Sequence, residues 1–324
     1  MHFLVCGGAG YIGSHMAQWL AAQGHQVTVL DNLSTGHREA VRWGELVEAD
    51  LLDPASLERA FAGGRIDAVM HFCASSLVGE SVREPYAYYR NNVAGTLNLL
   101  EAMRRHGVER LVFSSTAAVF GNPVSELIDE DHPKSPINPY GASKLMVERI
   151  LADAASAYGL RSIALRYFNA AGALPQHGIG EAHACETHLI PNVLKAALGH
   201  GPALKVFGED YPTPDGTCVR DYVHVQDLAQ AHALALDYMD THPGAHAFNL
   251  GNGRGFSVRE VIAAAAEVAG RDIPCEAAPR RAGDPAVLVA SSVRARRELG
   301  WSPEWTDLHA IIESAWGWHR DQAF

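Results

Sequence analysis

A glycine-rich segment near the start of the chain constrains its fold more than any other feature. The sequence GGAGYIG follows the short apolar run Phe3–Val5 and opens a helix-like run, Tyr11–Ala22. Glycines at such a point permit a tight turn and let the backbone approach a pyrophosphate closely. The free N–H groups and partial positive charge of the helix N-terminus favour the same anion. We therefore predict a dinucleotide site whose glycine-rich part comprises Gly7, Gly10, Tyr11, Ile12 and Gly13.

An acidic residue ends the second apolar run, Val27–Leu30, at Asp31. A carboxylate there accepts hydrogen bonds from a ribose diol and repels a 2′-phosphate, so the pattern predicts NAD rather than NADP. The nearby Arg38 is the one argument for NADP. The alternative is a glycine-rich turn without a ligand, and the ordered strand, helix and acid make it the weaker interpretation.

A tyrosine and a lysine form the second chemical motif. Asn138-Pro139 is typical of a helix start, with a capping side chain followed by proline at the first helical position. Tyr140 and Lys144 then share one helix face. A free tyrosine titrates near pH ~10, and a neighbouring ammonium and a positive nicotinamide are expected to lower that pKa. The pair therefore suits removal of a proton and a hydride from a carbinol.

Hydroxyl side chains follow another apolar run, Leu111–Phe113. Residues at the carboxyl end of a parallel strand face the ligand crevice, so Thr116 can hydrogen-bond the reacting hydroxyl. Taken alone, a Tyr-x-x-x-Lys pair is more often two surface helix residues. The dinucleotide motif favours the catalytic interpretation, with Tyr140, Lys144 and Thr116 as the candidate catalytic residues.

Together these motifs resemble the extended short-chain dehydrogenase/reductases, and among them the UDP-glucose 4-epimerases. The matching segments run nearly from end to end: GGAGYIGSH, LDNLSTGH, HFCASSLVGES, NNVAGT, FSSTAAVFG, PYGASKLMVE, LRYFNAAGA, VRDYVHVQDLA and FNLGNG. The resemblance implies interconversion of UDP-galactose and UDP-glucose with bound NAD. Tyr140 would take the proton of the sugar 4-hydroxyl, and the 4-keto sugar would turn over in the pocket before hydride returns to its opposite face.

The resemblance also assigns further binding residues. Those expected near NAD are Asn32, Asp50, Leu51, Phe72, Ala74, Ser76, Asn91, Ser114 and Phe168. Those expected near the nucleotide sugar, besides Thr116, are Asn169, His188, Lys205, Val206, Phe207, Arg220, Arg281, Asp284 and Leu288. Phe168 is also expected, with Asn169, near the sugar and diphosphate, and the segment Lys205–Phe207 is expected to cover the uracil. Arg220 and Arg281 suit bidentate contact with phosphate, the alternative being surface ion pairs such as Arg220 with Asp221.

Three positions depart from the family pattern. Ser76 stands where many relatives have a lysine that contacts NAD, His188 replaces an asparagine that some relatives use on the diphosphate, and Phe120 replaces a tyrosine. Leu288 falls where a bulky aromatic residue excludes N-acetyl sugars in some relatives. The smaller leucine predicts activity on UDP-galactose and weaker activity on UDP-N-acetylgalactosamine, unless neighbouring side chains fill the space.

Other functions stay open. A 4,6-dehydratase needs a second acid/base pair, but Thr116 is followed by Ala117 and Ala118, which supply no proton. A UDP-N-acetylhexosamine 4-epimerase shares every motif above. A dehydrogenase that releases NADH is less favoured, because the epimerase-type segments of the second half are all present. Non-catalytic NAD-sensing modules typically lose the tyrosine or the lysine, and this chain has both.

Composition sets further limits. The formal charge of -11 disfavours nucleic acid and acidic membranes as partners. Five cysteines without a CxxC pair fit reduced thiols in the cytoplasm. No secretory leader and no run of about 18 apolar residues is present. A His/Glu/Cys cluster lies in the second half, but its spacing fits no zinc pattern, so we expect a solvated loop and no metal. The members of this cluster are His177, Glu181, His183, Cys185, Glu186 and His188.

Alternating strand-like and helix-like runs predict an α/β fold with a doubly wound parallel sheet. Besides the three apolar runs named above, the strand-like runs are Ala68–His71, Ser162–Arg166 and Ala247–Leu250. We expect residues 1–168 and about 221–250 to form a Rossmann domain that binds NAD. Residues 169–220 and 251–324 are expected to form a smaller, discontinuous lobe that binds the nucleotide sugar. The long helical patterns Pro85–Arg105 and Pro139–Tyr158 match the helices through which relatives form homodimers.

Overall fold

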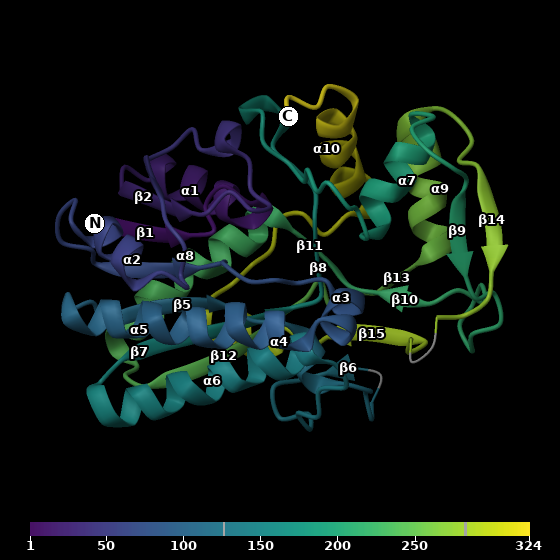
Figure 1. Ribbon diagram of the computed structural model, residues 1–324. Coiled ribbons are helices and arrows are strands. Elements are labelled where there is room, and N and C mark those ends of the chain that lie inside the picture. Colours follow the sequence, from purple (N-terminus) through teal and green to yellow (C-terminus); the bar gives the residue numbers. More distant parts are fainter. Residues whose placement is uncertain (126, 282–283) are drawn as a thin grey trace.

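A seven-stranded parallel sheet forms the centre of the computed structural model, which describes residues 1–125, 127–281 and 284–324 (Figure 1). The strand order is β12-β7-β5-β4-β1-β2-β3. The strands are β1 His2–Cys6, β2 Gln26–Asp31, β3 Glu45–Glu48, β4 Ala68–His71, β5 Arg110–Ser114, β7 Arg161–Tyr167 and β12 Ala245–Leu250. The order reverses between β1 and β4, where doubly wound folds bind their ligands. The predicted fold class is confirmed.

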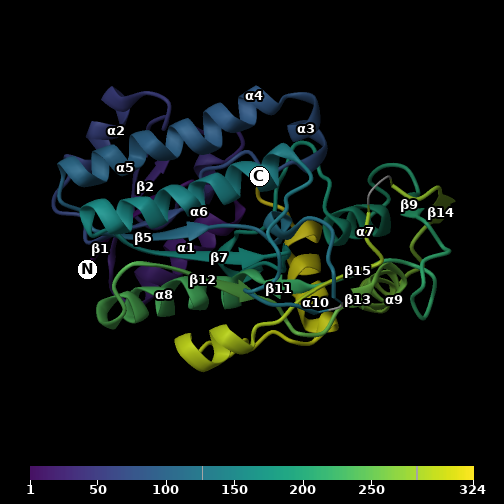
Figure 2. The same cartoon turned by 90° about the horizontal axis from the view of Figure 1, so that it is seen from below.

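Helices cover both faces of this sheet, as Figure 2 shows. The helices on one face are α2 Pro54–Phe61, α5 Gly95–Arg105 and α6 Pro139–Tyr158, and those on the other are α1 Tyr11–Ala22 and α8 Val225–Thr241. The sheet has one hydrophobic core on each face, and strand β1 contributes to both because successive side chains point to opposite faces. Phe3 and Val5 pack toward α1 and α8, whereas Leu4 and Cys6 pack toward α2, α5 and α6. Both faces are therefore apolar.

The helix expected over Pro85–Arg105 has an irregular middle. It begins as α4 Pro85–Tyr88, continues as a π-helical segment over Tyr89–Ala94, and ends as α5. A short helix, α3 Val78–Arg83, precedes it. The continuous α-helix that we predicted is therefore wrong at its centre, where the chain takes one residue more per turn.

Smaller sheets and further helices form most of the rest of the described chain, toward the right of Figure 1. Two short strands lead into this region, β8 Asn169–Ala171 and β11 Tyr222–His224. The remaining strands are β6 Leu127–Ile128, β9 Leu204–Phe207, β10 Val219–Arg220, β13 Phe256–Ser257, β14 Cys275–Ala278 and β15 Val287–Ala290. The helices are α7 Leu189–Ala197, α9 Val258–Ala269 and α10 Leu308–Arg320.

This second region has a core of its own, built mainly by α7, α9 and α10. Not all of the C-terminal part belongs to that core, because Ala295, Leu299 and Trp301 pack with α8 and the sheet. The domain division at residues 168, 221 and 250 stays a prediction. In the described part of the chain, no helix combines the length and the apolar character needed to cross a bilayer.

Candidate active site

The glycine-rich turn lies between β1 and α1, beside the point where the strand order reverses. Gly7 has φ +82°, and a Cβ at Gly13 would lie 2.1 Å from the Gly7 carbonyl oxygen, so both positions require glycine. Gly10 is the N-cap of α1, and among the described residues no side chain hydrogen-bonds this helix end. The first N–H groups of α1 are thus available to an anion.

Asp31 ends β2 directly beside this turn and is buried. Its Oδ2 accepts the Ala9 N–H at 3.0 Å and its Oδ1 accepts the Leu33 N–H at 2.8 Å. Burial raises its pKa, and these two hydrogen bonds oppose the rise. The carboxylate therefore joins the glycine-rich turn to the segment after β2.

Two more predicted NAD residues meet at the same edge of the sheet. Asn32 Nδ2 donates to Asp50 Oδ2 at 2.9 Å, which links the ends of β2 and β3. Leu51, the next residue, is buried. Arg38 forms an ion pair with Glu48, and its side chain is 61% exposed. Arg38 is therefore a weaker indication of NADP than its charge suggested, because the Glu48 carboxylate already pairs with it.

The segment after β4 holds Phe72, Ala74 and Ser76, and Asn91 belongs to the π-helical segment Tyr89–Ala94. Our sequence interpretation missed the residue that connects them, Asn92. Its Oδ1 accepts the Ser75 N–H at 2.9 Å and the Asn91 Nδ2 at 3.0 Å. Its Nδ2 donates to the Ser75 carbonyl and to Ser143 Oγ, each at 3.0 Å. Asn92 is buried and therefore holds this segment against α6.

The start of α6 is built as predicted. Asn138 is the N-cap, its side chain accepting the Gly141 N–H at 2.8 Å, and Pro139 takes the first helical position. Tyr140 and Lys144 share one face of the helix, with Lys144 Nζ 5.9 Å from the centre of the Tyr140 ring. Thr116 follows β5, and its Oγ1 accepts the Ala118 N–H at 3.1 Å. The structure thus brings the three candidate catalytic residues together at the carboxyl end of β5.

The pKa of Tyr140 differs from our expectation. Burial raises it, and the facing Thr116 hydroxyl opposes the rise. The expected lowering by Lys144 is therefore wrong for the protein alone, because desolvation of the phenolate dominates. Burial also lowers the pKa of Lys144 to about 7. Near neutral pH both the charged and the neutral form of this lysine are therefore populated.

A buried ion pair that the sequence analysis missed supports the end of β5. Arg166 on β7 donates to Glu148 on α6 at 2.9 and 2.6 Å, and both side chains are almost fully buried. Ser115 Oγ donates to the same carboxylate at 2.6 Å. The Ser114 hydroxyl is bonded to the Tyr167 phenol. These contacts fix the backbone on which Thr116 stands.

Several predicted substrate residues meet where β7 leaves the main sheet. Phe168 and Leu288 pack against one apolar cluster that also contains the buried Phe120. Asn169 Nδ2 donates to the Asp221 carbonyl at 2.8 Å, joining β8 to β11. Leu288 lies on β15 beside Arg220, its register partner on β10. Phe168, Asn169, Arg220 and Leu288 thus line one region of the second lobe.

Arg220 forms its ion pair with Asp284 and also donates to the Pro285 carbonyl at 2.9 Å. The suggested pairing with Asp221 is wrong. Asp221 is buried and accepts the N–H groups of Asn252 at 2.8 Å and Ala290 at 3.1 Å. Asp284 also lines a pocket between segments 122–125 and 284–287.

The predicted uracil segment is β9, which pairs with β14 at the far end of the second lobe. The Arg281 guanidinium lies 4.1 Å from the centre of the Phe207 ring. Lys205 is exposed, with Nζ 3.9 Å from Glu276, whereas Val206 is buried. The structure therefore brings Arg281 to this strand but gives it no contact with Arg220.

His188 is the N-cap of α7 and lies in a cluster with Glu181, His183 and Glu186. The solvated loop that we expected is wrong for Glu181 and Glu186, whose side chains are each only 4% exposed. The side chains of these four residues converge in space, which their irregular spacing in the sequence did not indicate.

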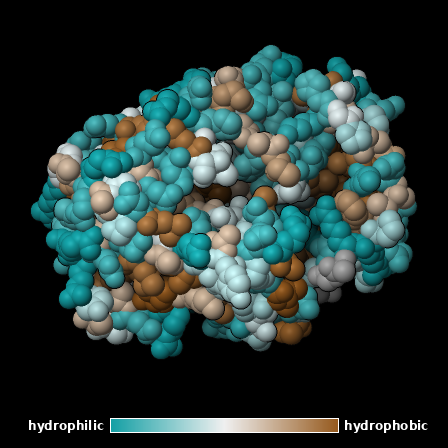
Figure 3. Space-filling model, in the orientation of Figure 1, coloured by the Kyte–Doolittle hydropathy of each residue, from teal (hydrophilic) through white to brown (hydrophobic). Residues whose placement is uncertain are grey.

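The described residues fit a dinucleotide. The α1 N-terminus offers free N–H groups, Gly7 and Gly13 leave space that a side chain would fill, and Asp31 stands at the end of β2. NAD requires the same three features. Figure 3 shows the surface hollowed near the centre of this face, between the sheet region and the second lobe.

Comparison with known proteins agrees with this geometry. The model of the NAD dependent epimerase/dehydratase family matches residues 3–251. The chain is 53% identical over 318 residues to the UDP-glucose 4-epimerase of Corynebacterium glutamicum, covering 98% of this chain and 95% of that protein.

Solved structures give the same result. The UDP-glucose 4-epimerase from Brucella ovis in complex with NAD has a TM-score of 0.94 and 51% identity, with 97% of each chain covered. The enzyme from Stenotrophomonas maltophila, with bound NAD and formylated UDP-arabinopyranose, has a TM-score of 0.95 and 42% identity over 99% of this chain and 98% of that one. The resemblance drawn from the sequence is confirmed, and the chain belongs to the NAD dependent epimerase/dehydratase family.

Proposed function

We propose that this protein is an NAD-dependent UDP-glucose 4-epimerase that interconverts UDP-galactose and UDP-glucose in galactose metabolism. One observation carries the proposal: Tyr140, Lys144 and Thr116 meet at the carboxyl end of β5, in a chain whose β1–α1 turn fits a dinucleotide. The similarity to UDP-glucose 4-epimerases over nearly the whole chain supports the choice of substrate.

In this proposal Tyr140 accepts the proton of the sugar 4-hydroxyl and later returns it. NAD held by the β1–α1 turn and Asp31 would supply the reversible hydride acceptor for C4 that inversion requires. Thr116 orients the reacting hydroxyl, because its own hydroxyl faces the phenol. Lys144 is almost fully buried with its Nζ 5.9 Å from the centre of the Tyr140 ring, so a lysine that is charged in the complex with substrate and NAD would favour the phenolate there.

We assign the nucleotide part of the substrate to the second lobe. Arg220 and Arg281 would anchor the diphosphate while the sugar turns over, with Asn169 and Phe168 beside the sugar. The ion pair between Arg220 and Asp284 holds that guanidinium in place. A diphosphate can replace one carboxylate as its partner, because both anions accept bidentate hydrogen bonds.

We also propose that two copies of the chain pair through α5 and α6. Tyr89, Val93, Leu97 and Met146 line an apolar depression between these helices. Leu97 is 40% exposed and Met146 is 46% exposed. Figure 3 shows hydrophobic side chains gathered over the region where Figure 1 shows these helices. Such a patch on a helix pair suits an interface between identical copies.

The cytoplasm is our proposed location. All five cysteines are free thiols, as a reducing compartment would keep them.

The deciding experiment is incubation of the purified protein with UDP-galactose without added NAD. We expect UDP-glucose to form, since the cofactor is regenerated in each cycle and stays bound. Addition of NAD to a stripped sample should restore a lost activity. Formation of a 4-keto-6-deoxy sugar would instead identify a dehydratase, and NADH release in step with turnover would identify a dehydrogenase. Binding of NAD without conversion of any UDP-sugar would identify a sensing module.

A further inference from the structure

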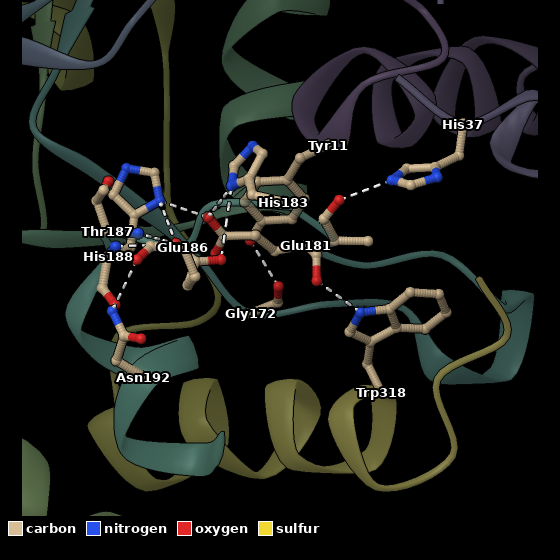
Figure 4. Close-up of polar contacts among 11 residues, drawn as sticks. Tyr11, His37, Gly172, Glu181, His183, Glu186, Thr187, His188, Asn192 and Trp318 are labelled. Atoms are coloured by element: carbon tan, nitrogen blue, oxygen red, sulfur yellow. Dashed lines mark hydrogen bonds and ion pairs between the residues drawn. The ribbon is translucent and has the colours of Figure 1, made fainter. Parts of the chain in front are cut away.

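Four metal-ligating side chains converge outside the catalytic residues, in the loop that leads into α7. Glu181, His183, Glu186 and His188 each offer one ligand atom, and these atoms all lie within 4.8 Å of one another (Figure 4). Two imidazoles and two carboxylates form a donor set that suits Zn²⁺. Mg²⁺ and Ca²⁺ prefer oxygen ligands alone, so the histidines favour a transition metal.

The spacing within this His/Glu cluster is close to what a tetrahedral ion requires. His183 Nδ1 lies 3.1 Å from Glu181 Oε1 and 3.6 Å from Glu186 Oε2. His188 Nδ1 contacts Glu181 Oε1 and lies 3.5 Å from Glu186 Oε1. Bonds of about 2.0–2.2 Å to a central Zn²⁺ place neighbouring ligand atoms about 3.3–3.6 Å apart. Three of these four separations are close to that range, whereas His188 Nδ1 and Glu181 Oε1 are in hydrogen-bond contact and must move apart to admit the ion.

One buried atom in the cluster has an unused hydrogen-bonding capacity. Glu186 Oε1 accepts the N–H groups of Thr187 at 2.8 Å and His188 at 2.9 Å. Glu186 Oε2 is buried and has no hydrogen-bond partner among the described residues. A buried carboxylate oxygen without a partner is costly. Glu186 Oε2 faces His183 Nδ1 at 3.6 Å, and a cation bound between them would give this oxygen a partner.

Without a metal, the cluster can neutralise itself as an ion-pair network. Each of the two imidazoles lies within ion-pair distance of both carboxylates. Self-neutralisation leaves Glu186 Oε2 without a hydrogen bond, however, whereas a bound ion does not.

We propose that Glu181, His183, Glu186 and His188 bind one Zn²⁺ ion at a structural site. The backbone of the same loop contacts two distant parts of the chain. The Glu181 carbonyl accepts from Trp318 Nε1 at 2.9 Å, and the Ala182 carbonyl is 2.7 Å from His37 Nε2. The ion therefore fixes a loop that connects the segment after β2, helix α10 and the start of α7.

This assignment also accounts for one departure from the family pattern. Some relatives have asparagine at the position of His188, and an amide cannot replace an imidazole as a zinc ligand. In this chain His188 Nδ1 points into the His/Glu cluster. The role expected for His188 at the diphosphate is thereby replaced by a role as metal ligand.

The test uses the full chain without a histidine tag. After removal of metals with a chelator, Zn²⁺ is titrated in competition with a chromophoric chelator, and bound metal is counted by mass spectrometry. We expect one equivalent bound with a Kd below about 1 µM, and affinity lower by about 10–100-fold or more in His183→Gln and in Glu186→Gln. Co²⁺ in place of Zn²⁺ should give the visible absorption of a tetrahedral site.

Two matched controls separate this site from surface binding. Cys185→Ser removes an exposed thiol from the same loop, and His242→Gln removes an exposed imidazole elsewhere. Both should bind Zn²⁺ as the wild type does. Zn²⁺ should raise the Tm of the wild type and of these controls but not of His183→Gln, because only a ligand of the folded state stabilises it.

The proposal is overturned if the wild type binds Zn²⁺ no tighter than about 10 µM, well short of structural sites. It is also overturned if His183→Gln and Glu186→Gln bind like the wild type. The wild-type titration remains decisive if a variant does not fold. Neither measurement depends on epimerase activity, so the metal site and the proposed function are tested separately.

Discussion

Lys144 Nζ donates a 2.7 Å hydrogen bond to the backbone carbonyl of Ser114, joining the helix that carries Tyr140 to the end of β5. The same ammonium lies 4.7 Å from the centre of the Phe113 ring. One lysine therefore positions two elements and also holds the local positive charge. A substitution at Lys144 should change both geometry and proton transfer, whereas one at Tyr140 should change proton transfer alone.

Replacement of Tyr140 by phenylalanine should reduce kcat on UDP-galactose by about 100-fold or more, because the proton acceptor is lost. The ring and its packing remain, so NAD binding and Tm should change little. Thr116→Ala should reduce kcat less, since it removes an orienting group rather than the base. Steady-state kinetics with UDP-glucose detection provide the measurement. Near-normal turnover in Tyr140→Phe would show that the base is another residue.

Replacement of Lys144 by methionine should remove most activity and change how stability depends on pH. Burial lowers the pKa of Lys144 from 10.5 in the unfolded chain to about 7 in the folded one. Between these values only the unfolded chain holds the proton, so wild-type stability from this group rises with pH. Below about pH 7 the full cost of the buried ammonium is present. Relative to the wild type, the variant should therefore be more stable near pH 6.5 than near pH 10.

Thermal unfolding of both proteins at the two pH values measures this effect. The Tm difference between variant and wild type should be larger at the lower pH by at least about 2 °C. Lys205→Met is the control, since this side chain is 57% exposed and should show no such trend. An equal Tm difference at both pH values would contradict the lowered pKa.

Asp31→Ala should reduce the preference for NAD over NADP by about tenfold or more, because the carboxylate repels a 2′-phosphate. The same change removes the acceptor of the Ala9 and Leu33 N–H groups, so a stability loss of about 1–3 kcal/mol should accompany it. Calorimetric Kd values for both cofactors give the preference. Equal Kd values of the wild type for NAD and NADP would show that Asp31 does not select between the two cofactors.

Leu97→Glu combined with Met146→Glu should convert a dimer to a monomer, because two charges would enter the apolar depression between α5 and α6. Light scattering at micromolar concentration gives the mass. Val293→Glu is the matched control, since Val293 is also exposed but lies beyond β15. A monomeric wild type would refute the proposed pairing.

Leu288→Tyr should lower kcat/KM for UDP-N-acetylgalactosamine relative to UDP-galactose by about tenfold or more, because a larger ring would crowd the substituent at C2. Leu288 is partly buried against Phe120 and Phe168, which limits how far such a ring can turn away. The comparison needs both sugars with both proteins. If the N-acetyl sugar is inert even with the wild type, the prediction of a broad pocket is wrong.

The sequence predicted the inner strands and one edge strand, β12, but not the other edge strand, β3. Strands β1, β2, β4, β5 and β7 have helices on both faces and therefore appear as apolar runs. Strand β3 lies at the edge, and its sequence ELVE gives only two apolar residues. The π-helical segment was equally hidden, because its hydrophobic pattern differs from that of an α-helix by a single residue.

For the site, local motifs were predictable and long-range contacts were not. Asn138 and Pro139 indicated a helix start, which set Tyr140 and Lys144 on one face. The ion pair of Glu148 with Arg166 depends on the packing of α6 against β7, which a pattern along the chain does not contain.

Arg220 shows why sequence neighbours are poor guides to ion pairs in a strand. Successive residues point to opposite faces, so Asp221 turns into the interior while Arg220 reaches Asp284. The partner that looked obvious from the sequence was the one that the strand geometry excludes.

The π-helical segment Tyr89–Ala94 makes the number of residues at this point a determinant of how the segment after β4 is held. Deletion of one residue here would let α4 and α5 continue as a regular helix. It would also rotate the side chains on one side of the deletion by about 100° relative to those on the other. The Asn92 amide would then turn away from the Ser75 backbone that it now holds. A relative that is one residue shorter at this point would retain the apolar contacts of the helix but lose the hydrogen bonds from Asn92 to the segment after β4. A one-residue gap here in a sequence alignment would therefore indicate a larger structural change than a substitution would.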